Sequence, residues 1–167
     1  MSFITPRSLH AAAIAALMML IACHNSLWDE LPSAITSFIS QYYPGSTVSR
    51  YEQRNDNYYV TVKDGPSITF DSDYHWTKID GNGEALPPIF IFNEMPKVYE
   101  YLEAREEQSD LYKAENLPRV ILLTIADFRL EYIKETGEIR TYTGDAAAPS
   151  AIAQAYYSGP YAYCSYI

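Results

Sequence analysis

Cysteine, histidine and positive charge are all scarce in this sequence of 167 residues. It has 2 cysteines and 3 histidines, and 12 basic residues stand against 21 acidic ones, which gives a formal net charge of -9. A nucleic-acid partner would require basic patches that neutralise phosphates, so this charge balance argues against one. It argues equally against docking on anionic lipid through charge alone.

Familiar catalytic and cofactor-binding patterns are also missing. The sequence has no Gly-x-Ser-x-Gly elbow and no Gly-rich phosphate loop. One histidine, His10, falls in an N-terminal segment that we expect to be removed, which leaves only His24 and His75. We therefore predict a protein that is not an enzyme, with no catalytic residues and no cofactor.

The one long apolar run lies near the N-terminus. Residues 11–22 read AAAIAALMMLIA, which is 12 residues, whereas a helix needs about 20 to cross a bilayer. With Arg7 ahead of it, the run fits a secretory signal peptide over residues 1–22. It ends in Leu20-Ile21-Ala22-Cys23, which resembles the lipobox of bacterial lipoproteins. That resemblance implies cleavage before Cys23 and a lipid on its sulfur; the alternative is an ordinary secretory signal with an incidental cysteine.

Lipidation at Cys23 would make the mature chain a membrane-tethered protein of the bacterial cell envelope. Residues 23–30 would then form a short polar tether. Residue 24 is His rather than the Asp associated with inner-membrane retention in enterobacteria, which points to the outer membrane. Cys164 would be the other cysteine, so the fold does not depend on an internal disulfide.

Alternation of apolar and polar residues dominates residues 48–79. A period of two is typical of strands with one buried face. Turn residues separate the runs, namely 55–57 and Asp64-Gly65, where a tight hairpin needs positive φ angles. The segment therefore predicts an antiparallel meander. Its alternating apolar residues are Tyr58, Val60, Val62, Ile68 and Phe70.

A helix is expected just before this meander, over residues 32–43. One apolar stripe at helical spacing is formed by Ile35, Phe38, Ile39 and Tyr42, and Pro44-Gly45 ends the helix. We expect this stripe to cover the face that carries Phe70. The opposite face would then be the candidate partner-binding surface, with Tyr59, Thr61 and Thr69 on it.

A second, looser copy of the same pattern follows. Residues 97–108 predict a helix after Met95-Pro96, and 120–125, 128–132 and 139–142 predict strands. We therefore predict an α+β fold of tandem helix-plus-antiparallel-meander repeats, at 31–85 and 86–145. Residues 146–167 form an Ala- and Tyr-rich tail without charge.

These motifs together resemble a known family. The lipobox, LPSAITSFISQYYPG, the alternating strand, the Asp-Gly turn and ITFD resemble the PepSY-like lipoproteins and secreted proteins of Bacteroidetes. The start of that family's second helix is similar to two further segments of this sequence, LPPIF and MPKVYEYLEAR. The resemblance covers residues 31–143 and implies a fold similar to the β-lactamase inhibitor protein, whose sheets form a concave face. The family has no established catalytic residues to carry over.

The acidic turns raise the question of a metal site. Asp71, Asp73 and His75 lie close together in sequence, and residues 80–84 resemble the start of a calcium loop. The glutamate expected at the twelfth loop position is absent, because Ile91 stands there. Turn chemistry explains both acidic clusters, and we predict no metal site.

Two functions remain in view. The first is a non-enzymatic envelope lipoprotein that binds an unidentified protein or peptide on its open sheet face. Analogy of fold with the β-lactamase inhibitor protein suggests inhibition of a hydrolase as one form of this binding. The alternative is an envelope sensor that binds a cation or small ligand through its acidic turns. The surplus of 16 tyrosines favours the first.

Overall fold

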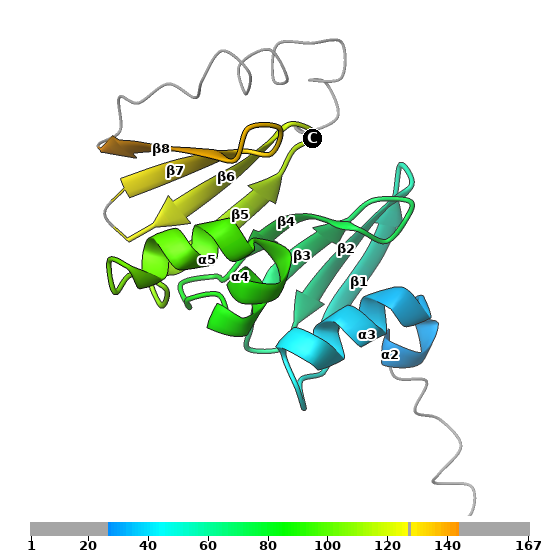
Figure 1. The fold of residues 1–167 in the computed structure, drawn as a ribbon. Coiled ribbons are helices and arrows are strands. Elements are labelled where there is room, and N and C mark those ends of the chain that lie inside the picture. Colours follow the sequence, from blue (N-terminus) through cyan, green and yellow to red (C-terminus); the bar gives the residue numbers. More distant parts are fainter. Residues whose placement is uncertain (1–26, 127, 144–167) are drawn as a thin grey trace, which may run out of the picture.

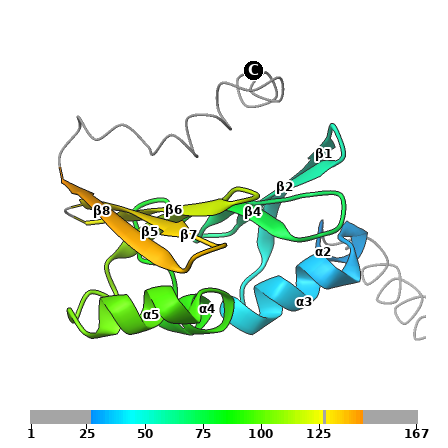
Figure 2. The same cartoon turned by 45° about the horizontal axis from the view of Figure 1, so that its top comes forward.

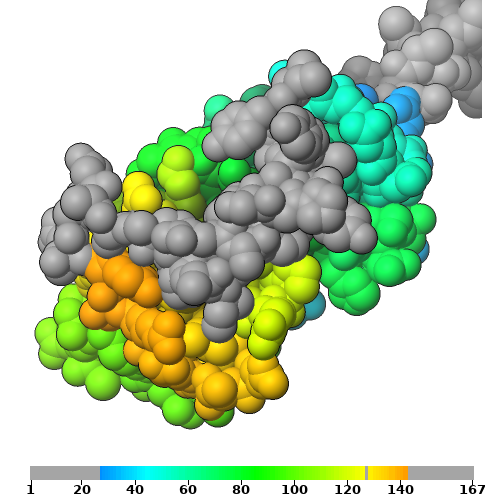
Figure 3. All heavy atoms as spheres, turned by 90° about the horizontal axis from the view of Figure 1, so that it is seen from above, coloured from blue at the N-terminus to red at the C-terminus, as the bar shows by residue number. Residues whose placement is uncertain are grey.

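A single antiparallel sheet is the centre of this computed structural model, which describes residues 27–126 and 128–143 (Figure 1). Each strand pairs with the next one along the chain, so the spatial order is β1 to β8. Strands β1 and β8 therefore lie at opposite ends of the molecule (Figure 3). The strands are β1 (Val48–Arg54), β2 (Asn57–Val62), β3 (Ser67–Phe70), β4 (Trp76–Asp80), β5 (Leu111–Asn116), β6 (Val120–Ile125), β7 (Phe128–Ile133) and β8 (Glu138–Thr143).

The helices lie on one side of this sheet, which gives two layers (Figure 2). They are α2 (Leu27–Glu30), α3 (Ser33–Tyr42), α4 (Pro88–Glu94) and α5 (Pro96–Glu103). Helix α3 buries Ile35, Ile39 and Tyr42, the expected stripe, and stops before Gly45, whose φ of 77° suits a reversal. None of the helices in the described residues is long and apolar enough to cross a membrane.

The predicted two faces of the first meander are confirmed. The five alternating apolar residues between Tyr58 and Phe70 are all buried in the core beneath the helices. Strand pairing aligns Tyr58 with Phe70 and Val60 with Ile68, which puts them on one face. Phe38 of α3 meets Phe70 edge-on, with ring centroids 5.3 Å apart. Apolar burial on this face is what fixes the register of the strands.

The first two turns of this meander differ. Asn55 and Asp56 join β1 to β2 with φ angles of 50° and 60°, as a two-residue turn requires. At the second turn the expectation was only half right, because Asp64 has a positive φ of 52° but Gly65 does not. The backbone N–H of Gly65 instead donates to the carbonyl of Val62 at 3.2 Å, so Asp64 alone provides the left-handed residue.

The second half departs further from expectation. Residues 88–94 form α4, a helix that the sequence reasoning missed. Helix α5 ends at Glu103, not at residue 108, because the chain turns at Arg105 and Glu106, the latter with φ of 58°. Residues 109–119 were expected as a polar connection with room for a short strand, and residues 111–116 of it form the full strand β5.

Both halves contribute to one sheet and one core. Strand β4 pairs with β5, aligning Ile79 with Ala114. Phe90 of α4 sits at the junction, with its ring 5.2 Å from that of Trp76 and 5.3 Å from that of Tyr42. The α+β class is therefore confirmed.

Several predicted features fall outside the described residues. These are the signal segment 1–22, the lipidation site Cys23, Cys164 and the tail 146–167. Of the expected tether at 23–30, the described part forms α2, and Trp28 packs against the core. Residues 27–30 are therefore helical rather than a simple polar tether.

Candidate functional site

The sheet face turned away from the helices, which we call the open face, carries most of the charged groups of β4 to β8. Strand pairing arranges its side chains in two rows that cross the sheet side by side. The first row is Asp80, Lys113, Thr124, Arg129 and Tyr142. The second row is Lys78, Glu115, Leu122, Glu131 and Arg140.

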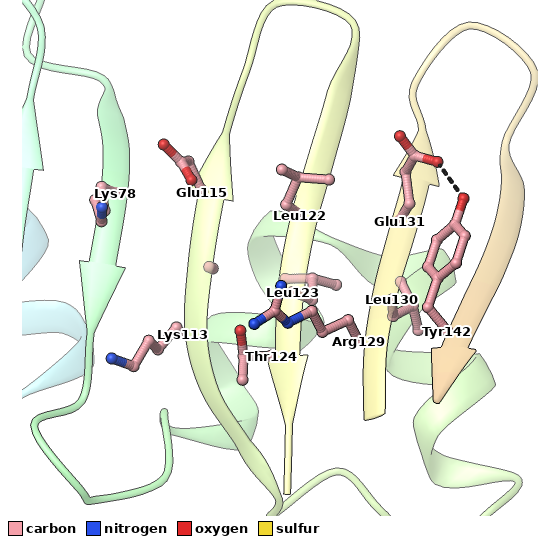
Figure 4. A pocket seen from close by; sticks show the side chains of 11 residues that line it. Lys78, Lys113, Glu115, Leu122, Leu123, Thr124, Arg129, Leu130, Glu131 and Tyr142 are labelled. Carbon is pink, nitrogen blue, oxygen red and sulfur yellow. Dashed lines mark hydrogen bonds between the residues drawn. The ribbon is translucent and has the colours of Figure 1, made fainter. Parts of the chain in front are cut away.

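A hollow of about 250 Å³ lies over these two rows (Figure 4). Its centre is β6, where Leu122 and Thr124 are short and half-buried. Longer side chains stand on the neighbouring strands β5 and β7, and neighbouring strands are about 4.8 Å apart. The hollow is thus a trough along β6. Its lining residues are Lys78, Lys113, Ala114, Glu115, Leu122, Leu123, Thr124, Arg129, Leu130, Glu131 and Tyr142.

The first row forms the basic end of the trough. Lys113 Nζ donates to Asp80 Oδ2 at 2.7 Å. Burial alone would raise the pKa of Asp80, but the Lys113 ammonium and the backbone N–H of Asn82 bring this pKa below its ordinary value. Arg129 is exposed and, among the described residues, makes no ion pair or hydrogen bond through its side chain.

The second row carries two acids, Glu115 and Glu131, in the same row as the bases Lys78 and Arg140, and both acids are already engaged. Tyr142 Oη donates to Glu131 Oε2 at 2.9 Å, and Glu131 is only 1% exposed. Burial, and then the hydrogen bond to this carboxylate, raise the pKa of Tyr142. Glu131 and Glu115 both have further interactions. This part of the trough is therefore rigidly held.

Beyond the second row the open face becomes apolar. Leu117, Val120 and Ile133 are buried together, and Leu122 packs against them. Lys134 Nζ donates to the carbonyl of Leu117, and burial lowers the pKa of Lys134. The trough thus runs from a basic end at Thr124 toward an apolar end at Leu122 and Val120.

The residues predicted from sequence to contact a partner lie on the same face but not in this hollow. Tyr59 pairs directly with Thr69, and Thr61 stands two residues further along β2, so the three lie together. The Arg54 guanidinium lies over the Tyr59 ring, 5.1 Å from its centroid. They belong to β2 and β3, whereas the hollow lies over β4 to β8.

The basic residues of the hollow were missed by the sequence reasoning. The run at 120–125 was predicted as a strand, but it is apolar almost throughout, so no alternation marked Thr124 and Leu122 as open-face residues. Period-two alternation in residues 111–116 and 128–133 was the signal available. This alternation places Lys113 and Arg129 on the face of the sheet opposite to the one that buries Ala114 and Leu130.

The acidic turns use their carboxylates for backbone hydrogen bonds. Asp71 Oδ1 accepts from the backbone N–H groups of Asp73 at 3.0 Å and His75 at 2.9 Å. Asp80 Oδ1 accepts from the backbone N–H of Asn82 at 2.9 Å. Within residues 27–126 and 128–143, no group of three or more His, Cys, Asp or Glu side chains could hold a metal ion.

Trp76, which follows the first of these turns, is a core residue. It is 5% exposed, and its Nε1 donates to Glu94 Oε2 at 3.0 Å. Tyr42 Oη donates to the other oxygen of the same carboxylate at 2.5 Å. Glu94 thereby ties α3 and β4 to α4, with Trp76 as part of the core.

Comparison with known proteins gives similarity in fold. No family model matches the chain, and no curated protein matches its sequence. One similar solved structure is a predicted periplasmic protein of the DUF2874 family from Bacteroides vulgatus ATCC 8482, with TM-score 0.61 and 16% identity. A predicted calcium-regulated periplasmic protein from Bacteroides thetaiotaomicron gives 0.60 and 16%. In both cases the match covers 70% of this chain and 93% of the other.

A third similar structure is a predicted periplasmic protein of unknown function from Bacteroides vulgatus ATCC 8482. Its TM-score is 0.55 at 20% identity, over 68% of this chain and 93% of the other. At such identities the likeness shows a shared fold and nothing more specific. Almost the whole of each of these proteins therefore corresponds to the described fold.

Proposed function

We propose that this protein is a non-enzymatic, lipid-anchored binding protein of the bacterial cell envelope, which holds a protein or peptide on its open sheet face. The observation that carries the proposal is the trough along β6. It combines a hollow of about 250 Å³ with an apolar end and with the guanidinium of Arg129, which makes no ion pair among the described residues. Concave surfaces that combine apolar area with a few convergent polar groups are typical of binding sites.

The envelope location is supported from two directions. Leu20-Ile21-Ala22-Cys23 resembles a lipobox, and the similar solved structures are described as periplasmic proteins. A lipid on Cys23 would hold the chain at the membrane, with the outer membrane as the expected site.

A distant relationship to PepSY-like proteins and to the β-lactamase inhibitor protein is part of the same proposal. Helix α3 precedes β1–β4 just as α5 precedes β5–β8, an order that tandem repeats would produce. Inhibition of a hydrolase would then be one use of the open face. Fold alone is a weak argument for that activity, so the proposal is limited to binding.

The test is capture of a partner from native envelopes with two matched variants. Thr124→Arg places a long side chain in the trough, whereas Ser37→Arg makes the same charge addition on the exposed surface of α3. We expect Thr124→Arg to lose the proteins that the wild type captures and Ser37→Arg to retain them. Equal capture by both folded variants would contradict the proposal.

Calcium sensing is the second candidate, because one similar structure is described as calcium-regulated. The acidic turns would provide its ligands. Titration calorimetry with Ca²⁺ separates the two functions. Binding tighter than about 10 μM, lost in Asp71→Asn or Asp80→Asn, would favour the sensor over the peptide-binding protein.

A further inference from the structure

We propose that the basic end of the trough binds a carboxylate, and that the ligand is an extended peptide with an acidic residue two positions from an apolar one. This inference rests on the proposed function and names its ligand. The three groups that would hold the carboxylate are Lys113, Thr124 and Arg129, which are direct cross-strand neighbours on β5, β6 and β7.

The geometry of the sheet places these three residues side by side. Thr124 lies between the other two, and Lys113 and Arg129 are separated by two strand spacings, about 10 Å. Figure 4 shows the Arg129 guanidinium beside Thr124, whereas the Lys113 side chain points the other way and its Nζ donates to Asp80, so Lys113 would reach a ligand above Thr124 by turning from Asp80. A carboxylate above Thr124 would then face donors from all three strands.

Each group has hydrogen-bonding capacity left for a ligand. Arg129 makes no side-chain hydrogen bond or ion pair within the described residues, and its planar fork matches a carboxylate in a bidentate arrangement. Lys113 donates one of its three ammonium hydrogens to Asp80, which leaves two. The hydroxyl of Thr124 likewise makes no hydrogen bond in the described part of the chain.

The second row determines which residue of the peptide can lie next to its acidic residue. Leu122 lies two residues from Thr124 on the same face, about 7 Å away, which is also the spacing of alternate side chains in an extended peptide. Glu115 and Glu131 flank Leu122 on either side. A second acid at this point would lie beside two carboxylates that already have partners, whereas an apolar side chain would contact Leu122. The charge pattern thus favours acid-x-apolar over acid-x-acid.

The experiment is an NMR titration of the mature chain with short capped peptides. The probe is acetyl-Gly-Glu-Gly-Leu-Gly-amide. Its two comparison peptides replace either the glutamate by glutamine or the leucine by glutamate. Arg129→Gln removes the guanidinium. Arg50→Gln is the matched control, because Arg50 lies on the same face but on β1, where it is highly exposed.

We expect the probe to shift the amide signals of Lys113, Thr124 and Arg129, and both comparison peptides to bind at least tenfold more weakly. Arg129→Gln should lose tenfold or more in affinity for the probe, with Arg50→Gln within twofold of the wild type. Equal binding of the glutamate and glutamine peptides would overturn the inference. So would displacement of the probe by an equal concentration of inorganic phosphate, which would reveal a general anion site.

Failure here is distinguishable from failure of the proposed function. If the probe does not bind while Thr124→Arg still abolishes capture of an envelope partner, the open face stands as the binding surface and the carboxylate ligand is wrong. If Thr124→Arg also leaves capture unchanged, both proposals fall.

Discussion

Two residues on adjacent strands show how alternation in the sequence places one side chain in the core and another on the open face. Phe70 on β3 is fully buried under α3, whereas Tyr59 on β2 points to the open face and is half-buried. Both are aromatic, so composition alone does not separate them. Their positions in the two-residue alternation separate them, because successive side chains of a strand point to opposite faces.

Replacing each of the two by alanine should therefore have very different effects. Phe70→Ala opens a cavity beside Phe38 in the core and should lower the free energy of unfolding by about 3–5 kcal/mol. Tyr59→Ala should cost about 1 kcal/mol or less, because its ring is not enclosed by the core. Thermal and urea melts measure both. Equal losses would mean that the open face is as deeply buried as the helix face.

The hydrogen bond from Tyr42 to Glu94 makes the stability of the protein depend on pH in alkaline solution. Burial, followed by the hydrogen bond to Glu94, raises the pKa of Tyr42 from 10.0 to about 12. The folded state then holds this proton more tightly than the unfolded state, so stability is full below pH 10 and declines as pH rises toward 12.

Urea unfolding at pH 8 and pH 11 tests this linkage. We expect the wild type to lose more of its free energy of unfolding between the two pH values than Tyr42→Phe, which has no proton to release. Tyr43, whose pKa burial also raises, is present in both proteins and cancels in the comparison. Parallel losses in the two proteins would show that Tyr42 is not the group responsible.

At the scale of elements, the outward residues of strands that alternate clearly could be predicted, whereas those of an apolar strand could not. Strands β2 and β3 alternate clearly, and both were located with the correct inward residues. Strand β6 is apolar on both faces, so nothing in its sequence marked Thr124 as exposed. Helix α4 is short and lies between Pro87 and Pro96, and its periodicity was too brief to recognise.

The candidate site was predictable in part for the same reason. The side of the sheet that would be free followed from alternation around Phe70. The position of the hollow along that side did not, because it depends on which long side chains stand next to short ones across strands. Those neighbours, such as Lys113 beside Thr124, are set by a register that only the folded sheet defines.

The hairpin between β1 and β2 offers a test of local structure. Asn55 and Asp56 both have positive φ angles, and glycine adopts that conformation more readily than aspartate at the second position. We expect Asp56→Gly to stabilise the protein by about 0.5 kcal/mol and Asp56→Val to destabilise it by about 1–2 kcal/mol. Urea melts of both should place the wild type between them, and any other order would contradict the turn assignment.

At the scale of the whole molecule, one sheet separates a closed side from an open side. The helices cover the first, and their aromatic contacts at Phe90 join the two halves of the chain. The open face of that sheet carries the paired charged rows and the trough. A protein held at a membrane by its N-terminus would be able to present this face to a partner.

The anchor itself is tested by Cys23→Ser. If Cys23 carries lipid, the wild type should fractionate with membranes and gain the mass of the acyl groups, while the variant should be soluble and unmodified. Intact-mass analysis after fractionation gives both readings. Identical mass and solubility for the two proteins would show that the lipobox resemblance is misleading.

The central claim is that the trough along β6 is the surface that meets the partner. The most direct measurement is photo-crosslinking in native cells, with a photoreactive benzoylphenylalanine placed at Thr124 in one strain and at Ser37 in another. The account predicts a discrete crosslinked adduct from position 124 on the open face and none from position 37 on α3. An adduct from position 37 alone, or the same adduct from both, would contradict it.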